Sequence, residues 1–129
     1  MSTIAGFFFF MLYLVFGIAM LVAFTRLYMT VTPYNEAQDI HDGKMAPAIA
    51  LAGAMLGFTF PLLVASYTHT YFLGFLMWGI IAGFVQLGAF WVLYTYLPRY
   101  IENNNAAGAT VFAVASVCVG LINAASFIP

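Results

Sequence analysis

Four long runs of apolar residues divide the chain, and each is about as long as a membrane-crossing helix. The runs cover about residues 4–28, 46–67, 72–97 and 106–127. A helix that crosses the hydrocarbon core of a bilayer needs about 20 mostly apolar residues. The pattern therefore predicts an all-α membrane protein with four transmembrane helices, in one transmembrane domain over residues 1–129.

The composition excludes a soluble domain. The chain is 65% hydrophobic and 5% charged, whereas soluble domains carry about 25% charged residues. The net charge of -1 and the absence of a basic tract exclude a nucleic-acid partner. The lone Cys118 excludes an internal disulfide framework and a cysteine-rich metal site. The lipid bilayer is thus the one partner that composition requires.

Positive charges orient the chain. The connection over about residues 29–45 holds four of the seven charged side chains, including Lys44, and Arg26 lies just before it. Arg99 lies in the connection over about residues 98–105. Because loops rich in Lys and Arg stay cytoplasmic, we expect both connections in the cytoplasm. Both termini are then expected on the outer side of the membrane, which is the periplasmic side if the membrane is a bacterial inner membrane.

The polar segment 31–44 predicts a short surface helix. A Thr32-Pro33 pair is typical of a helix start and Gly43 of a helix end. We expect three carboxylates on the water-facing side of this helix, namely Glu36, Asp39 and Asp42. Two interpretations remain open, a solvated connector and a docking surface for a cytoplasmic protein partner.

A short repeat indicates two related helical hairpins. Residues 40–48 and 101–109 both read Ile, two polar residues, a turn pair, one further residue and then Ala-x-Ala. Upstream, Thr32-Pro33 has a counterpart in Leu97-Pro98. Each unit has an even number of spans, so the two hairpins would be parallel repeats about an axis along the membrane normal.

Small residues predict how the helices pack. Helices in lipid associate through close packing and hydrogen bonds, and small residues permit close approach. The first run is bulky, with Phe7 to Phe10 in a row, and is expected to face lipid. The expected packing residues on the other three runs are Gly53, Gly57, Pro61, Gly79, Gly83, Gln86, Ser116, Gly120 and Asn123.

One polar contact is predicted in the middle of the membrane. Pro61 has no N–H, so the carbonyl of Gly57 loses its helical partner and must be satisfied otherwise. At about 1.5 Å per residue, Gly57, Gln86 and Ser116 lie at similar depths. We expect the Gln86 amide to bind the Gly57 carbonyl or Ser116. The alternative is a polar path across the membrane, lined by Gln86, Thr59, Ser116 and Asn123.

The sequence contains no recognisable catalytic constellation. Nucleophile–base pairs and phosphate loops are missing, as is the intramembrane ionisable group typical of transport sites. His41 and His69 would lie on opposite sides of the membrane, so they cannot share a metal ion. We therefore expect no enzyme activity, no cofactor and no metal site.

Several motifs together resemble the YjfL-type family of bacterial inner-membrane proteins. They are Thr32-Pro33-x-Asn35-Glu36, Ile40, Gly43-Lys44, Gly57-x-x-x-Pro61-Leu62, Gln86, the asparagines before the fourth run, and Gly120-x-x-Asn123-Ala124-Ala125. The resemblance covers almost the whole chain and implies a multipass protein of unknown function, often with four spans. It also implies gene neighbours of the phage-shock and ATP-grasp types, and supplies no catalytic residues. The chain departs from the family at Gly43-Lys44, where relatives often have asparagine.

Two functional hypotheses follow. The first is a scaffold or partner subunit of an envelope-associated complex, which docks a cytoplasmic protein at residues 31–44 and is a candidate homo-oligomer. The second is a small oligomeric channel or transporter built from the repeat. A membrane-embedded enzyme is disfavoured because the sequence lacks a catalytic constellation.

Overall fold

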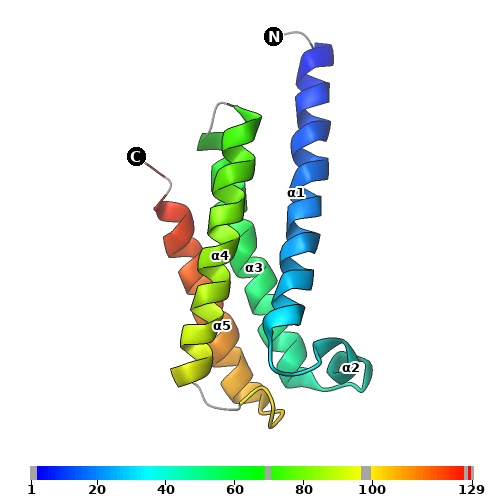
Figure 1. The fold of residues 1–129 in the computed structure, drawn as a ribbon, viewed down its shortest axis with the longest axis vertical. Helices are drawn as coiled ribbons and strands as arrows, with labels where there is room; N and C mark the ends of the chain where they lie inside the picture. The colour runs from blue at the N-terminus through cyan, green and yellow to red at the C-terminus, as the bar shows by residue number, and fades with distance from the viewer. Residues whose placement is uncertain (1–2, 69–70, 97–99, 127, 129) are drawn as a thin grey trace.

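The computed structural model describes residues 3–68, 71–96, 100–126 and 128, and the regular elements in these ranges are all helices. Four of the helices are long and apolar enough to cross a membrane, which confirms the all-α membrane fold. The helices, shown in Figure 1, are α1 (Thr3–Val31), α2 (Glu36–His41), α3 (Met45–Thr68), α4 (Phe72–Tyr96) and α5 (Ala106–Ala125).

The four long helices cover the four apolar runs of the sequence. At one end of the bundle lie α2 and residues 100–105, which precede α5, and we name this the α2 end. Both chain termini lie toward the opposite end (Figure 1). Four residues used in the sequence argument lie outside the described residues, namely His69, Leu97, Pro98 and Arg99. The cytoplasmic position of the α2 end therefore stays a prediction.

The helix boundary in the polar segment differs from the prediction. Thr32 does not start a helix, because its N–H still donates to the carbonyl of Tyr28, 3.1 Å away, at the end of α1. Pro33 instead ends α1, since the residue before a proline disfavours the α conformation. The cap of α2 is Asn35, whose side-chain oxygen accepts from the N–H of Gln38 at 3.1 Å. The predicted end is confirmed, because Gly43 follows α2 with φ of 81°.

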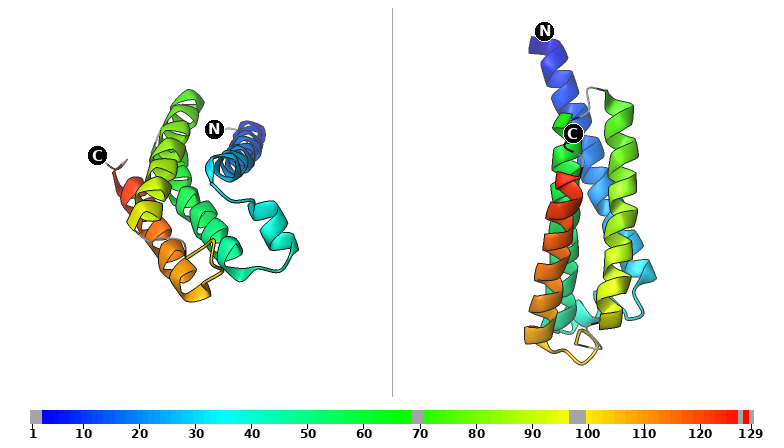
Figure 2. Two further views of the ribbon diagram at one scale, coloured as in Figure 1. Left: turned by 60° about the horizontal axis from the view of Figure 1, so that its bottom comes forward. Right: turned by 90° about the vertical axis from the view of Figure 1, so that its left-hand side faces the viewer.

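The centre of the molecule is the pair α3 and α5, which make the most extensive helix contact. The two helices run parallel, both starting at the α2 end (Figures 1 and 2). Small residues allow this approach. A Cβ atom on Gly53 would lie 2.5 Å from the α-carbon of Ala113, and so would overlap the α5 backbone. The α3–α5 pair is thus held by close backbone packing.

Helix α1 lies at the side of the bundle and contacts α3 and α4. The half of α1 nearer the α2 end attaches through aromatic rings. Phe24 stacks on Phe58 of α3 with ring centroids 4.5 Å apart, and Tyr28 meets Phe90 of α4 edge-on at 5.0 Å. Near its start, α1 carries Phe7 to Phe10, all of which are exposed. The expectation that the first run faces lipid agrees with this exposure.

The repeat is visible in the backbone of the two connections at the α2 end. The N–H of Gly43 donates to the carbonyl of Ile40 at 3.0 Å, and the N–H of Asn104 donates to the carbonyl of Ile101 at 3.1 Å. Gly43 and Asn104 also share a left-handed conformation, with φ of 81° and 54°. Glycine and asparagine are the residues that adopt this conformation most readily. The two connections therefore enter α3 and α5 through the same turn.

The second connection also caps the first hairpin. The side-chain oxygen of Asn104 accepts from the N–H of Ala46, 3.0 Å away in the first turn of α3. The next residue, Asn105, caps α5 by accepting from the N–H of Gly108 at 3.1 Å. Because the first N–H groups of a helix have no partner within it, each of these two asparagines satisfies one N–H at the start of a central helix.

Candidate functional site

The buried amide of Gln86 makes the mid-membrane contact that was expected to reach Gly57 or Ser116. Its nitrogen donates to the backbone carbonyl of Ser116 at 2.8 Å, and both residues are buried. The Gln86 nitrogen also lies beside Gly57, where a Cβ atom would come within 2.5 Å of it. The expected contact is thus made with α5, through the Ser116 backbone carbonyl.

The Gly57 carbonyl that Pro61 leaves without a helical partner lies against Gly120. A Cβ atom on Gly120 would overlap this carbonyl oxygen. The α-hydrogen of Gly120 points along the same direction, which is the arrangement of weak Cα–H···O contacts between helices. Pro61 itself is fully buried. These glycines bring the two backbones together at the turn of α3 where Pro61 removes one helical hydrogen bond.

The other predicted packing residues join the same interior. Gly79 and Gly83 of α4 lie where α1 and α3 approach, since a Cβ atom on Gly83 would lie 3.4 Å from the ring of Phe58. Asn123 of α5 is buried, and its amide donates to the carbonyl of Ala82 on α4 at 3.3 Å. Thus α4 is tied to α5 at two depths, through Gln86 and through Asn123.

The residues proposed for a polar path do not all lie together. Gln86, Ser116 and Asn123 are buried. Thr59 is exposed, and its hydroxyl donates to the carbonyl of Met55 in its own helix at 2.9 Å.

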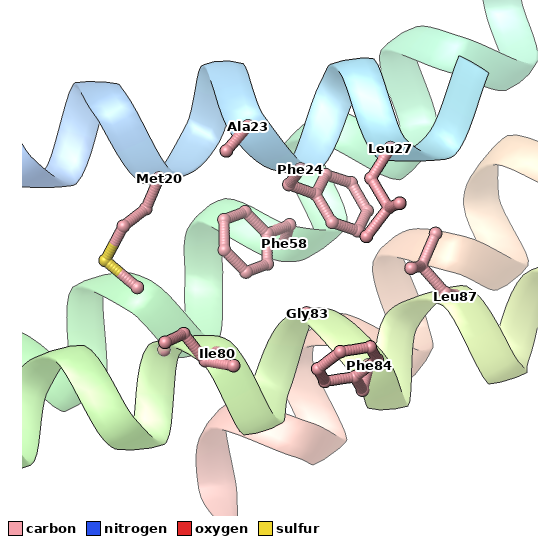
Figure 3. Close-up of a pocket in the computed structure, with 10 residues that line it drawn as sticks. Met20, Ala23, Phe24, Leu27, Phe58, Ile80, Gly83, Phe84 and Leu87 are labelled. Atoms are coloured by element: carbon pink, nitrogen blue, oxygen red, sulfur yellow. The ribbon is translucent and has the colours of Figure 1, made fainter. Parts of the chain in front are cut away.

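A cavity of about 160 Å³ between α1 and α4 is lined by apolar side chains and glycines, such as Met20, Phe24 and Phe84 (Figure 3). This crevice therefore offers an apolar surface and no polar binding site.

The most unusual group in the described residues is the carboxyl of Glu36. This side chain is 0% exposed, and neither of its oxygens has a hydrogen-bond partner. The expectation that Glu36 lies on the water-facing side of the short helix is therefore wrong. Glu36 occupies the first position of α2 and is the one residue of that helix that is buried. Its cap at Asn35 fixes the turn that directs this side chain inward.

Two tyrosine hydroxyls near Glu36 are also buried without a partner. They belong to Tyr28, from the end of α1, and Tyr34, from the connection before α2. The Thr32 hydroxyl donates instead to a backbone carbonyl, that of Met29 at 3.2 Å or that of Tyr34 at 3.3 Å. Burial raises the pKa of the Tyr34 hydroxyl, so it stays protonated and can act as a donor. We name Tyr28, Thr32, Tyr34 and Glu36 the Glu36 cluster.

Burial changes the acidity of Glu36. Desolvation disfavours the charged form and raises the pKa of this carboxyl from 4.5 to about 7. The nearby Thr32 hydroxyl partly offsets this effect, and the negative charge of Asp39 adds to it. Near neutral pH, Glu36 therefore holds a proton for much of the time.

The other two carboxylates of the polar segment lie closer to water. Asp39 forms an ion pair with Lys44 at 3.4 Å, and its side chain keeps 21% of its exposure. Asp42 is exposed and accepts from the amide of Gln38 at 3.1 Å. Of the three carboxylates proposed for docking, the structure leaves Asp39 and Asp42 accessible.

Sequence reasoning missed two features that the chain does signal. Phe24 and Tyr28 of α1 recur as Phe90 and Tyr94 of α4, in a shared Phe-x-x-Leu-Tyr pattern that extends the repeat. The Tyr94 hydroxyl donates to the carboxylate of Glu102 in the following connection. The hydrophobic pattern of α2 could not predict that Glu36 points inward, because α2 has no apolar face. In the sequence, Glu36 is distinguished only by its place beside Asn35 in the motif Thr32-Pro33-x-Asn35-Glu36.

A comparison with protein families identifies the chain. The family described as "Domain of Unknown Function (DUF350)" matches residues 2–127. This chain belongs to the DUF350 family. The expected resemblance to YjfL-type proteins is thereby confirmed.

Two named relatives of this DUF350 protein cover most of its length. It is 33% identical over 116 residues to "UPF0719 inner membrane protein YjfL" of Escherichia coli (strain K12), covering 88% of each chain. It is 32% identical over 111 residues to "UPF0719 transmembrane protein YshE" of Bacillus subtilis (strain 168), covering 81% of this chain and 82% of that protein. No solved structure matches the chain.

Within the described part of this DUF350 chain, no group of three or more His, Cys, Asp or Glu side chains could hold a metal ion. Cys118 is exposed on α5. The Glu36 cluster, with its buried unpaired carboxyl, is the arrangement with the most distinctive chemistry, and we take it as the candidate functional site.

Proposed function

We propose that this DUF350 protein is a partner subunit of a membrane-associated complex, and that residues 36–44, named the α2 segment, dock a cytoplasmic protein. The inner-membrane name of the Escherichia coli relative supports the same location for this chain. The scarcity of charge on the four long helices supports a bundle that is itself solvated by lipid.

The charge and the exposed side chains of the α2 segment support the docking proposal. The α2 segment gathers most of the charge of the chain on a short helix that stands beside the start of α3 (Figure 2, left). Its outward side chains are Ala37, Gln38, Ile40, His41, Asp42 and Lys44, all exposed. Ile40 supplies an exposed apolar side chain among these polar ones, and protein interfaces combine an apolar centre with a polar rim. The segment thus offers both an apolar contact and charges of both signs.

A photo-crosslinking amino acid at Ile40 tests the proposal in bacterial cells that express the full chain. We expect one discrete crosslinked protein, and a several-fold weaker adduct in the Asp39→Asn, Asp42→Asn double variant, because rim charges mainly steer association. The matched control is Asp39→Glu with Asp42→Glu, which keeps both charges and should keep the adduct. An adduct of equal strength in all three proteins, or none in any, would contradict a docking role for these carboxylates.

The alternative of a channel within one chain conflicts with the packing of α3 on α5. Gly53, Gly57 and Gly120 bring the two backbones into contact where such a path would have to pass. A channel would therefore need an interface between copies of the chain. Cysteine labelling along all four spans, with Gln86 among the positions, separates the two ideas in a Cys118→Ala background. Labelling by a water-soluble reagent would favour the channel, and protection favours the partner subunit.

A further inference from the structure

The docking of α2 on the bundle depends on a side chain that can ionise. Helix α2 packs on α3, and Glu36 is the one residue of α2 that is buried. Most short surface helices attach through apolar residues, but Ala37 and Ile40 of α2 are exposed. The attachment of α2 therefore buries a carboxyl group where an apolar anchor would be usual.

The surroundings of Glu36 suit a neutral carboxylic acid and not a carboxylate. Burying an unpaired charge costs several kcal/mol, and both Glu36 oxygens are buried without a partner. The hydroxyls of Tyr28 and Tyr34 are likewise buried without a partner. A hydroxyl can donate or accept, so these two groups can serve a neutral acid through small rotations or a bridging water.

Among the described residues, no cation acts on the carboxyl of Glu36. From α1 the nearby titratable group is Tyr28, and from the following connection it is Tyr34. From α2 it is Asp39, whose charge acts against ionisation of Glu36. Lys44 is engaged with Asp39, and Glu102 of the other connection adds a negative charge near Tyr34. The start of α3 contributes no ionisable side chain.

We propose that Glu36 is a proton-binding site that couples the pH on the α2 side of the membrane to the docking of α2. With the proton bound, Glu36 is neutral and α2 stays on the bundle. When the proton leaves, the carboxylate gains hydration by moving out, and α2 separates from α3. The proposal concerns α2 docking in the isolated protein, so it can fail while the partner-binding proposal stands.

The direction of the pH dependence follows from the two states of Glu36. The docked carboxyl has its pKa raised to about 7, against 4.5 for the free side chain. Below about pH 4.5 both states carry the proton, and docking is strongest. Between about 4.5 and 7 only the docked state keeps the proton, so the ratio of docked to undocked protein falls about tenfold per pH unit. Above about pH 7 both states are ionised and the ratio levels off.

Pulsed electron paramagnetic resonance on the purified full chain tests the proposal. Spin labels go on cysteines placed at Ile40 and Asn103, both exposed, in a Cys118→Ala background. We expect one narrow distance distribution at pH 5 and a second, broader population that grows until about pH 7.5. Glu36→Gln, which is neutral at every pH, should keep the narrow distribution throughout. The control is His41→Asn, because histidine also titrates near neutrality, and it should keep the wild-type transition.

Three outcomes would overturn the proposal. They are a distance that does not change with pH in the wild type, a transition that survives in Glu36→Gln, and docking restored at pH 8 by sodium or potassium, which would indicate a cation site. A second measurement does not need the variant to fold. The infrared C=O absorption of a protonated carboxyl should be present at pH 5 and lost by pH 8.5, and its absence at pH 5 would also overturn the proposal.

Discussion

Gln86 shows how a single polar side chain behaves inside this bundle. Its nitrogen is satisfied by the Ser116 carbonyl at 2.8 Å, while its oxygen is buried without a partner. A half-satisfied amide gains less than a fully bonded one, because the unpaired oxygen costs desolvation. The residue therefore orients α4 against α5 and contributes only modestly to stability.

Replacing Gln86 by methionine should lower the free energy of unfolding by about 0.6–2 kcal/mol, the range for hydrogen bonds between membrane helices. Methionine keeps the length of the side chain and removes its hydrogen bond. The measurement is unfolding in mixed micelles, followed by circular dichroism. The control is Thr95→Val, since the exposed Thr95 hydroxyl bonds only to the Trp91 carbonyl of its own helix. A loss above about 4 kcal/mol would mean that Gln86 supports more than this one bond.

Glu36 is a single residue whose charge bears on the proposed function as well. A carboxyl with a pKa of about 7 changes charge in the range where cells hold their pH. The same side chain is the one residue of α2 that is buried. The chemistry of the candidate site thus rests on one residue whose burial is decided by its neighbours.

At the scale of the elements, the α3–α5 pair is the rigid part of the molecule. Its small residues permit backbone contact, and its two starts are both capped by asparagines of one connection. Helix α1 is attached differently, through aromatic side chains along its length, from Tyr13 to Tyr28. We therefore expect substitutions at the α3–α5 contact to cost more than equal substitutions elsewhere.

The pair Gly120→Ala and Gly88→Ala tests this difference. A methyl group on Gly120 would overlap the Gly57 carbonyl, and backbone cannot move aside, so we expect a loss of about 1–3 kcal/mol. A methyl group on Gly88 meets nothing within 4 Å, and alanine is the better helix former, so its effect should be neutral or slightly stabilising. Unfolding in mixed micelles compares the two variants directly. Equal effects would refute the α3–α5 contact as drawn.

The repeat belongs to the same scale. The turn Ile-x-x-x before α3 and α5 could be predicted from residues 40–48 and 101–109, because a local hydrogen bond and a left-handed residue define it. The positions of α1 and α4 around the central pair could not be predicted. They depend on which side chains meet across the bundle, and Phe24 and Phe90 meet different neighbours although they recur in the sequence.

For the whole molecule, the charge pattern predicts its direction in the membrane. Four spans place both chain ends on the same side, away from the α2 end (Figure 1). Arg26 and Lys44 lie toward the α2 end, and positively charged loops stay cytoplasmic. The charge pattern thus predicts that α2 faces the cytoplasm.

A reporter fusion at the C-terminus measures this direction. Alkaline phosphatase, which is active only outside the cytoplasm, should be active there, and green fluorescent protein should stay dark. The matching fusion within the α2 segment, after Gly43, should show the opposite pair of results. A fluorescent C-terminal fusion would reverse the predicted topology and would place Glu36 on the outer side.

The sequence by itself determined the number, the length and the helical nature of the spans. This is because a bilayer requires each crossing segment to satisfy its own backbone, and about 20 apolar residues in a helix do so. Only the tertiary structure decided which faces of these helices meet, that Asn104 caps α3, and that Glu36 is buried. In lipid, inward and outward faces are equally apolar, so no alternation of polar and apolar residues records the packing. The burial of Glu36 depends on how α1, α2 and α3 pack on one another, which the local spacing of residues does not encode.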